Sequence, residues 1–255
     1  MIPPDIFIQN AFLKYEGNVL FDHLNLKIPA GKFTCLLGPS GVGKSTLLRF
    51  IAQLIPKHKQ RHFQCQGTVR VEPHLDLKSQ LSYLAQENPL LPWLNAKNNA
   101  LIGFKLRGEK MSKEVLQTTE TLFKQMGLEK ATTLYPHQLS GGMRQRVALI
   151  RIFLENRPII LMDEPFSALD AITRFELQTL IGNLLKNRTV FFVTHDPLEA
   201  CRLADDIVIL EGKPVQIRQV LALPPGVPRH PLDTSLLKFQ TLLYEALLNA
   251  KEQTK

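Results

Sequence analysis

The pattern of apolar residues along the chain first indicates a set of short strands. The segment 20–28, LFDHLNLKI, alternates polar and apolar residues, which is typical of a strand with one buried face. Three later runs are apolar without alternation, as expected of strands in a parallel sheet that is covered on both faces. These runs are FTCLL at 33–37, PIILMD at 158–163 and TVFFVTH at 189–195.

Between these strands, apolar residues recur with helical spacing. The pattern predicts helices over 44–54, over about 112–126, where Gly127 would stop the helix, and over 172–185. The first of these helices would bury one face, made of Leu47, Leu48, Ile51 and Leu54. We therefore expect an α/β domain over 1–220 with a helical insertion at about 87–156, followed by a short C-terminal helical tail over 221–255.

Composition narrows the class of protein only slightly. Of the 255 residues, 44% are hydrophobic and 21% are charged, which indicates a globular chain with a real core. The net charge of +8 suits nucleic acid, acidic lipid headgroups or nucleotide, although a solvated basic surface needs no partner. The three scattered cysteines favour a reducing compartment over a disulfide framework. No apolar run approaches the ~20 residues of a membrane span, and the N-terminus shows no secretory signal.

The segment GPSGVGKST, residues 38–46, fills the phosphate-loop pattern between a predicted strand and a predicted helix, the context in which this pattern binds nucleotide. Its glycines would let backbone N–H groups approach the phosphates, and Lys44 would neutralise the β- and γ-phosphates. Ser45 could ligate Mg²⁺. We therefore assign nucleotide contacts to the whole loop: Gly38, Pro39, Ser40, Gly41, Val42, Gly43, Lys44, Ser45 and Thr46.

Four polar residues follow apolar stretches and are expected near these phosphates. Asp163 ends a strand at the sheet edge where Mg²⁺ would lie, and the adjacent Glu164 could polarise the attacking water. His195 follows another strand and could donate to the γ-phosphate, although a lone histidine is more often a packing residue. Gln86 could reach the Mg²⁺ or the attacking water, but taken alone it would carry no meaning.

A zinc site is a weaker possibility that the sequence also raises. His58, His62 and Cys65 have a spacing that could hold zinc. The surrounding lysines and arginine would repel a cation, however, and no fourth ligand is nearby. We do not favour a zinc site.

The segment LSGGMRQR, residues 139–146, suggests a second anion-binding surface. Ser140, Gly141 and Gly142 would expose amides at the start of a basic helix, where the helix dipole favours a phosphate. One nucleotide pocket does not need two such surfaces in one chain. The residues alone leave open why the chain carries a second such surface.

Together these motifs resemble the ATP-binding subunit of ABC transporters over residues 5–215. The family's motifs occur here in its order: the phosphate loop, Gln86, the LSGG signature at 139–142, Asp163 with Glu164, the SALD loop at 167–170, and His195. The resemblance implies a P-loop NTPase (RecA-like) fold with a mostly parallel sheet, an antiparallel β subdomain and the helical insertion. It also implies that Asp170 of the SALD loop contacts nucleotide and that Tyr15 stacks on adenine, although core packing is the other reading of Tyr15.

The resemblance implies a transport ATPase that binds ATP and Mg²⁺ and pairs head to tail with a second copy of itself. In that pair the signature of each copy would meet the nucleotide on the other copy's phosphate loop, which would account for the second anion-binding surface. Finer likeness is to importers of nitrate, sulfonates and taurine, and to related ones for thiamine-precursor pyrimidines. The expected partners are transmembrane permease subunits and, indirectly, an extracytoplasmic solute-binding protein, at the cytoplasmic face of the inner membrane. The transported molecule does not follow from the sequence, because the subunit never touches it.

Other readings stay open at this stage. An exporter ATPase would carry the same motifs. A soluble ATPase of this family acting on nucleic acid or ribosomes would suit the positive charge, but it usually carries two cassettes or a long coiled coil, so no nucleic-acid partner is expected. An ordinary phosphate-loop kinase or GTPase has no use for LSGG.

The segment ENPLLPWLN, residues 87–95, is the expected docking surface for a permease helix. Leu90, Leu91 and Trp93 are apolar, close together and directly follow Gln86. Partner contact and catalysis could therefore be linked by one short segment. The alternative is that Trp93 belongs to the core of the helical insertion.

Overall fold

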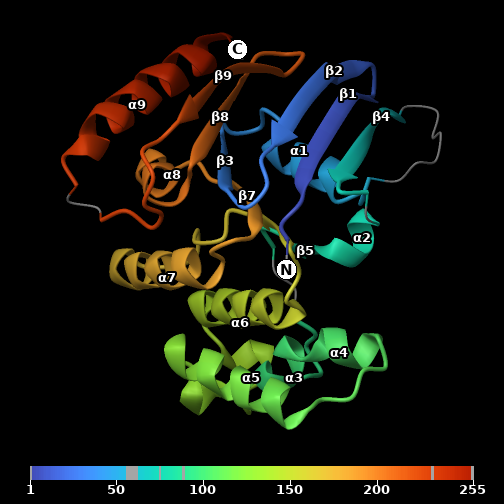
Figure 1. The fold of residues 1–255 in the computed structure, drawn as a ribbon, viewed down its shortest axis with the longest axis vertical. Helices are drawn as coiled ribbons and strands as arrows, with labels where there is room; N and C mark the ends of the chain where they lie inside the picture. The colour runs from blue at the N-terminus through green and yellow to red at the C-terminus, as the bar shows by residue number, and fades with distance from the viewer. Residues whose placement is uncertain (1, 56–62, 75, 88–89, 231–232, 254–255) are drawn as a thin grey trace.

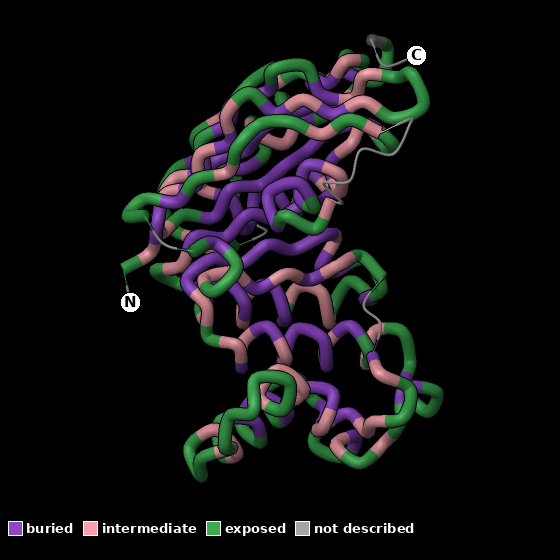
Figure 2. Tube along the Cα trace, turned by 90° about the vertical axis from the view of Figure 1, so that its right-hand side faces the viewer, coloured by how far each residue is buried: buried purple, intermediate pink, exposed green. Residues whose placement is uncertain are grey.

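The computed structural model describes residues 2–55, 63–74, 76–87, 90–230 and 233–253. Both sheets lie in one half of the molecule and a group of helices forms the other half (Figure 1). Figure 2 shows that the buried backbone is concentrated in the sheet half and continues into the helices nearest to it.

A six-stranded sheet forms the centre of the sheet half. Its spatial order is β5-β6-β7-β3-β8-β9, with β9 antiparallel to β8 and the other pairs parallel. The strands are β5 (Leu81–Leu84), β6 (Ile159–Asp163), β7 (Thr189–Val193), β3 (Phe33–Leu37), β8 (Asp206–Glu211) and β9 (Gln216–Ala222). Every residue of β3, β6 and β7 is buried, which confirms the strands predicted from continuous apolar runs.

A second, three-stranded sheet lies beside the first and is antiparallel throughout. Its order is β2-β1-β4, made of β2 (Asn18–Ile28), β1 (Asp5–Tyr15) and β4 (Phe63–Glu72). The alternation read in the segment 20–28 is present in β2, where Phe21, Leu24, Leu26 and Ile28 are buried. The predicted mostly parallel sheet with an antiparallel subdomain is therefore confirmed.

Nine α-helices are described, and two single 3₁₀ turns lie at Glu129–Ala131 and Pro136–Gln138. The helices are α1 (Lys44–Ile51), α2 (Leu77–Gln80), α3 (Ala96–Ala100), α4 (Ile102–Leu106), α5 (Lys113–Gln125), α6 (Gly141–Glu155), α7 (Ala171–Leu184), α8 (Pro197–Leu203) and α9 (Ser235–Gln253). Helices α3 to α6 pack together as the lower group in Figure 1. The tail forms the predicted helix, α9, which packs on α8 and β8.

Two helix ends can be compared with their predictions. The first helix ends at Ile51, not Leu54, because Gln53 takes a left-handed conformation with φ 55° and turns the chain away. Leu54, predicted on the buried face, is therefore exposed. Helix α5 agrees with its prediction, since the Ser112 hydroxyl accepts from Val115 N at its start and Gly127, with φ 62°, follows its end.

None of the helices described is long and apolar enough to cross a membrane. The three cysteines form no disulfide with one another: Cys35 and Cys201 are buried and Cys65 is partly buried.

Candidate nucleotide-binding and catalytic site

The phosphate loop connects the buried strand β3 to α1. Gly43 starts α1 with φ 108°, and a Cβ there would lie 3.1 Å from the side chain of Leu20 on β2. Only glycine fits this turn without strain, so the loop's amides can face outward at the helix N-terminus. Val42 is buried in the core, which leaves only its backbone available to a ligand.

Lys44 curls back over the loop. Its ammonium group donates to the carbonyl oxygens of Gly38 at 2.8 Å and Pro39 at 2.9 Å. Burial lowers the pKa of Lys44, while the nearby carboxylates of Glu164 and Asp163 oppose that shift. A cation is thus held at the start of α1 where phosphate charge would be neutralised.

Ser45 and Asp163 meet at the end of β6. The Ser45 hydroxyl donates to Asp163 Oδ1 at 3.0 Å, and Asp163 Oδ2 is buried without a hydrogen-bond partner among the described residues. Burial raises the pKa of Asp163, and the hydrogen bond from Ser45 opposes that rise. A hydroxyl next to a buried carboxylate oxygen without a partner is a donor set that suits a hard divalent cation such as Mg²⁺.

Glu164 is the point where two other predicted residues meet. Gln86 Nε2 donates to Glu164 Oε2 at 3.3 Å, and His195 Nδ1 lies 3.2 Å from Glu164 Oε1. The backbone of Glu164 has φ 46°, which is strained for a residue with a side chain, and its N–H is held by Val193 O at 3.0 Å. This turn separates the directions of Asp163 and Glu164, so one carboxylate faces Ser45 and the other faces Gln86 and His195.

A buried acid lies behind His195 that sequence reasoning did not single out. Glu199 of α8 is buried and lines a small cavity together with Glu164, Arg174 and His195. Burial, reinforced by the negative charge of Asp196, raises the pKa of Glu199 to about 8, although Arg174 and a hydrogen bond with Thr194 oppose that rise. The cavity beside His195 therefore contains a buried carboxyl group whose raised pKa favours its protonated form.

The signature residues lie at the start of α6, in the helical half of the molecule and away from α1 (Figure 1). The Ser140 hydroxyl accepts from Met143 N at 3.2 Å and so caps the helix. Gly141 is exposed, whereas a Cβ on Gly142 would lie 3.1 Å from the side chain of Leu169 and 3.3 Å from Ala168 O. The signature is thus packed directly against the SALD loop.

Gln145 connects these two segments to the catalytic carboxylate. Its side-chain amide donates to Glu164 O at 3.2 Å, and its side-chain carbonyl accepts from Ala168 N at 3.1 Å. The residue is buried in a helix whose other buried residues are mostly apolar. A glutamine at a core-facing position of a predicted helix is the sequence signal that could have identified Gln145, which was not among the predicted site residues.

The two residues assigned from resemblance alone are both exposed. The Asp170 carboxylate accepts from Thr173 N at 3.0 Å and caps α7. Tyr15 ends β1 and pairs with Asn18 of β2, the strand whose Leu20 lies against Gly43 of the phosphate loop, and its ring meets the edge of Phe63 with 6.5 Å between centroids. An exposed aromatic face near the loop is what adenine stacking requires, and that role for Tyr15 stays a prediction.

Two of the three zinc candidates, His58 and His62, lie outside the described residues. Cys65 is partly buried on β4. In the described part of the chain, no group of three or more histidine, cysteine or acidic side chains could hold a metal ion.

The expected docking segment is only partly exposed. Trp93 is 69% exposed, which contradicts the reading of Trp93 as core. Leu90, which was expected on the docking surface, is buried instead. The reason is local: the side-chain carbonyl of the buried Asn99 accepts from Leu91 N at 2.7 Å, and its NH₂ group donates to the carbonyls of Leu91 and Leu94, which draws this turn onto α3.

Comparison with known proteins agrees with this geometry. The family model described as ABC transporter matches residues 21–167. The aliphatic sulfonates import ATP-binding protein SsuB 1 of Rhodococcus jostii is 38% identical over 93% of this chain and 91% of its own length. The taurine import ATP-binding protein TauB of Escherichia coli K12 is 37% identical over 85% of this chain and 83% of its own length.

A solved structure is similar over most of the fold. It is the dimeric, post-hydrolysis state of the ATP-binding cassette MJ0796 bound to ADP and Pi. The TM-score is 0.74 at 29% sequence identity, and the match covers 87% of this chain and all of that one.

Proposed function

Since the chain belongs to the ABC transporter family, as an ATP-binding subunit that hydrolyses ATP, we propose that it powers the import of a small organic sulfonate through a partner permease. The observation that carries the ATP-hydrolysis part of the proposal is the meeting of Gln86 and His195 on Glu164, beside the Ser45–Asp163 pair. The likeness to TauB and SsuB 1 supplies the direction of transport and the class of solute.

Each residue of the site has a task in hydrolysis. Lys44 and the loop amides bind the β- and γ-phosphates, and Glu164 accepts a proton from the attacking water as its oxygen approaches phosphorus. Gln86 orients that water from one side of Glu164, and His195 donates to the γ-phosphate from the other. Ser45 and Asp163 would hold Mg²⁺, which when bound neutralises phosphate charge.

The signature is proposed to act on the nucleotide of a second copy. Ser140 and the amides of Gly141 and Gly142 start α6 away from α1, so they need a partner to meet a phosphate. A head-to-tail pair places each signature on the other copy's phosphate loop. The dimeric state of the MJ0796 cassette, bound to ADP and Pi, supports this pairing.

The permease is proposed to dock on the exposed ring of Trp93, which places the subunit at the cytoplasmic face of the inner membrane. An extracytoplasmic solute-binding protein would deliver the solute to that permease. A transport role is testable in cells, because a strain carrying Lys44→Ala should lose growth on taurine or an alkanesulfonate as sole sulfur source. Unchanged growth, or loss of growth only without a thiamine precursor, would contradict the sulfonate assignment.

The dimer is tested with Glu164→Gln, which should bind ATP and cut hydrolysis by roughly 10²–10⁴-fold, as expected for a lost general base. Added ATP should then double the mass in light scattering. Two matched variants check the interpretation: Lys44→Ala in this background should bind no ATP, and Ser140→Arg should bind ATP but stay monomeric. A Glu164→Gln protein that remains monomeric at saturating ATP, both alone and with the permease, would contradict the head-to-tail pair.

A further inference from the structure

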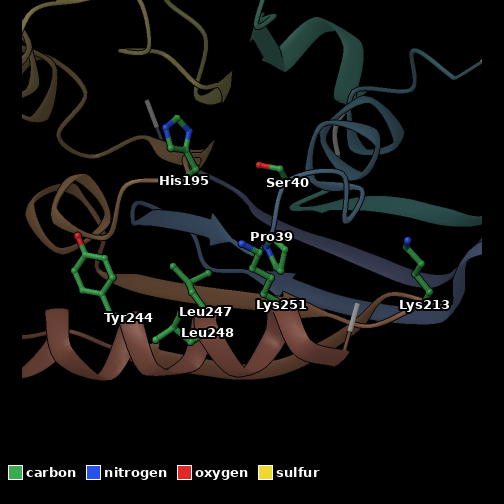
Figure 3. A pocket seen from close by; sticks show the side chains of 9 residues that line it. Pro39, Ser40, His195, Lys213, Tyr244, Leu247, Leu248 and Lys251 are labelled. Carbon is green, nitrogen blue, oxygen red and sulfur yellow. The ribbon is translucent and has the colours of Figure 1, made fainter. Parts of the chain in front are cut away.

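A cavity lies between the phosphate loop and the C-terminal helix. It has a volume of about 500 Å³ and is lined on one side by Pro39, Ser40 and His195 and on the other by Tyr244, Leu247 and Leu248 of α9. Figure 3 shows Tyr244 and Leu247 projecting from α9 on the side where Pro39, Ser40 and His195 lie. The cavity thus lies between the phosphate loop and a helix that carries none of the residues assigned to hydrolysis.

Helix α9 buries one apolar face against the rest of the chain and leaves further apolar side chains exposed. Leu236, Leu243 and Ala250 are fully buried and recur every seven residues, so they form the face that packs on the rest of the chain. Tyr244 is 55% exposed and Leu248 64% exposed on the neighbouring flank, which faces the cavity. An exposed apolar flank beside a functional cavity marks a contact surface.

An exposed aliphatic side chain near the signature is available to a second copy for such a contact. Ile172, in the first turn of α7, is 73% exposed and lies two residues after Asp170. The segment just before it is fixed to the signature by the Gly142–Leu169 contact and by the hydrogen bond of Gln145 to Ala168 N. A signature that reaches the phosphate loop of another copy therefore brings Ile172 to the same neighbourhood.

We propose that the second copy of this chain covers the cavity between the phosphate loop and α9, with its Ile172 packed against Tyr244 and Leu248. The inference rests on the head-to-tail pair of the proposed function and extends its interface to the C-terminal helix. Charge agrees with this occupant, because Lys213 and Lys251 line the cavity and the exposed Asp170 accompanies Ile172. Twofold symmetry makes the contact occur twice in each pair.

The test measures the dissociation constant of the ATP-bound Glu164→Gln dimer by sedimentation. Leu248→Ser and Ile172→Ser should each weaken the dimer by about ten-fold or more, as expected when a buried aliphatic contact is lost. Because the two side chains are proposed to touch, the double variant should lose less than the product of the two effects. ATP affinity of each monomer, followed with a fluorescent analogue, should stay unchanged.

Leu242→Ser is the matched control, since Leu242 is exposed on the opposite flank of α9 and should leave the dissociation constant unchanged. An ATP-driven dimer whose affinity is unaffected by Leu248→Ser and Ile172→Ser would overturn this surface and leave the head-to-tail pair standing. Fully multiplicative effects would overturn the direct contact. Absence of any dimer in the Glu164→Gln protein, both alone and with the permease, would overturn the pair, and this surface with it.

Discussion

Gln145 joins the signature helix to Glu164, with 3.2 Å between its side-chain nitrogen and the main-chain oxygen of that residue. The other end of the same amide holds Ala168 N at 3.1 Å. Glu164 therefore has two supports, since its side chain meets Gln86 and His195 while its strained backbone is held from α6.

Replacing Gln145 by methionine should lower turnover while ATP affinity stays close to that of the unchanged protein. Both hydrogen bonds would be lost, and a shift of about 1 Å in a catalytic group costs on the order of a hundred-fold in rate. The measurements are kcat for hydrolysis and ATP affinity of the monomer. Gln117→Met, at an exposed position on α5, is the control and should change neither. Equal losses of kcat and of folded protein would argue that Gln145 only stabilises the core.

Trp93→Ala should uncouple transport without unfolding the subunit. The ring is largely exposed, so its removal costs the isolated chain little, whereas a large aromatic anchor in a permease contact is worth about ten-fold or more in affinity. The measurement is solute uptake and ATP hydrolysis in vesicles that contain the permease. Leu106→Ala tests another exposed apolar residue of the helical half and should leave uptake unchanged. A fall in melting temperature that accounts for the transport loss would count against docking at Trp93.

Glu199→Gln should make the free energy of unfolding less dependent on pH. The ordinary pKa of this carboxyl is 4.5 and the fold raises it to about 8. Between these values the folded state holds a proton that the unfolded chain has released, so stability falls as pH rises and levels off above about 8. The glutamine variant lacks this proton, and its stability should fall less steeply over the same range. Denaturant unfolding at a series of pH values measures the difference, and identical slopes would show that Glu199 is already charged at neutral pH.

The sequence predicted three strands of the six-stranded sheet because their burial is local and continuous, whereas β5, β8 and β9 were not predicted. Phe33–Leu37, Ile159–Asp163 and Thr189–Val193 are apolar at nearly every position, so no tertiary information was needed to place Asp163 or His195 at a sheet edge. The phosphate loop was equally accessible, because its glycines, lysine and serine follow a fixed spacing.

The errors occurred where a single neighbour decides the outcome. Leu54 continues the helical pattern of α1, yet the left-handed Gln53 ends the helix before it. Leu90 and Trp93 are both apolar residues of the same short segment, so the sequence does not distinguish them. The hydrogen bonds of Asn99 hold the turn so that Leu90 is buried and Trp93 is exposed. The position of α9 beside the phosphate loop was also beyond reach, because an amphipathic pattern shows that a helix has an apolar face and not what that face meets.

The bridge made by Gln145 has a consequence for two copies working together. In a head-to-tail pair, Gln145 would connect Glu164, which activates water at one nucleotide, to the signature, which binds the other nucleotide. The second copy's Gln145 makes the same connection in the opposite direction. Each nucleotide site would therefore be linked to the other by two equivalent bridges. Neither site in such a pair changes state alone. A sigmoidal dependence of hydrolysis on ATP concentration is the kinetic form that this arrangement would take.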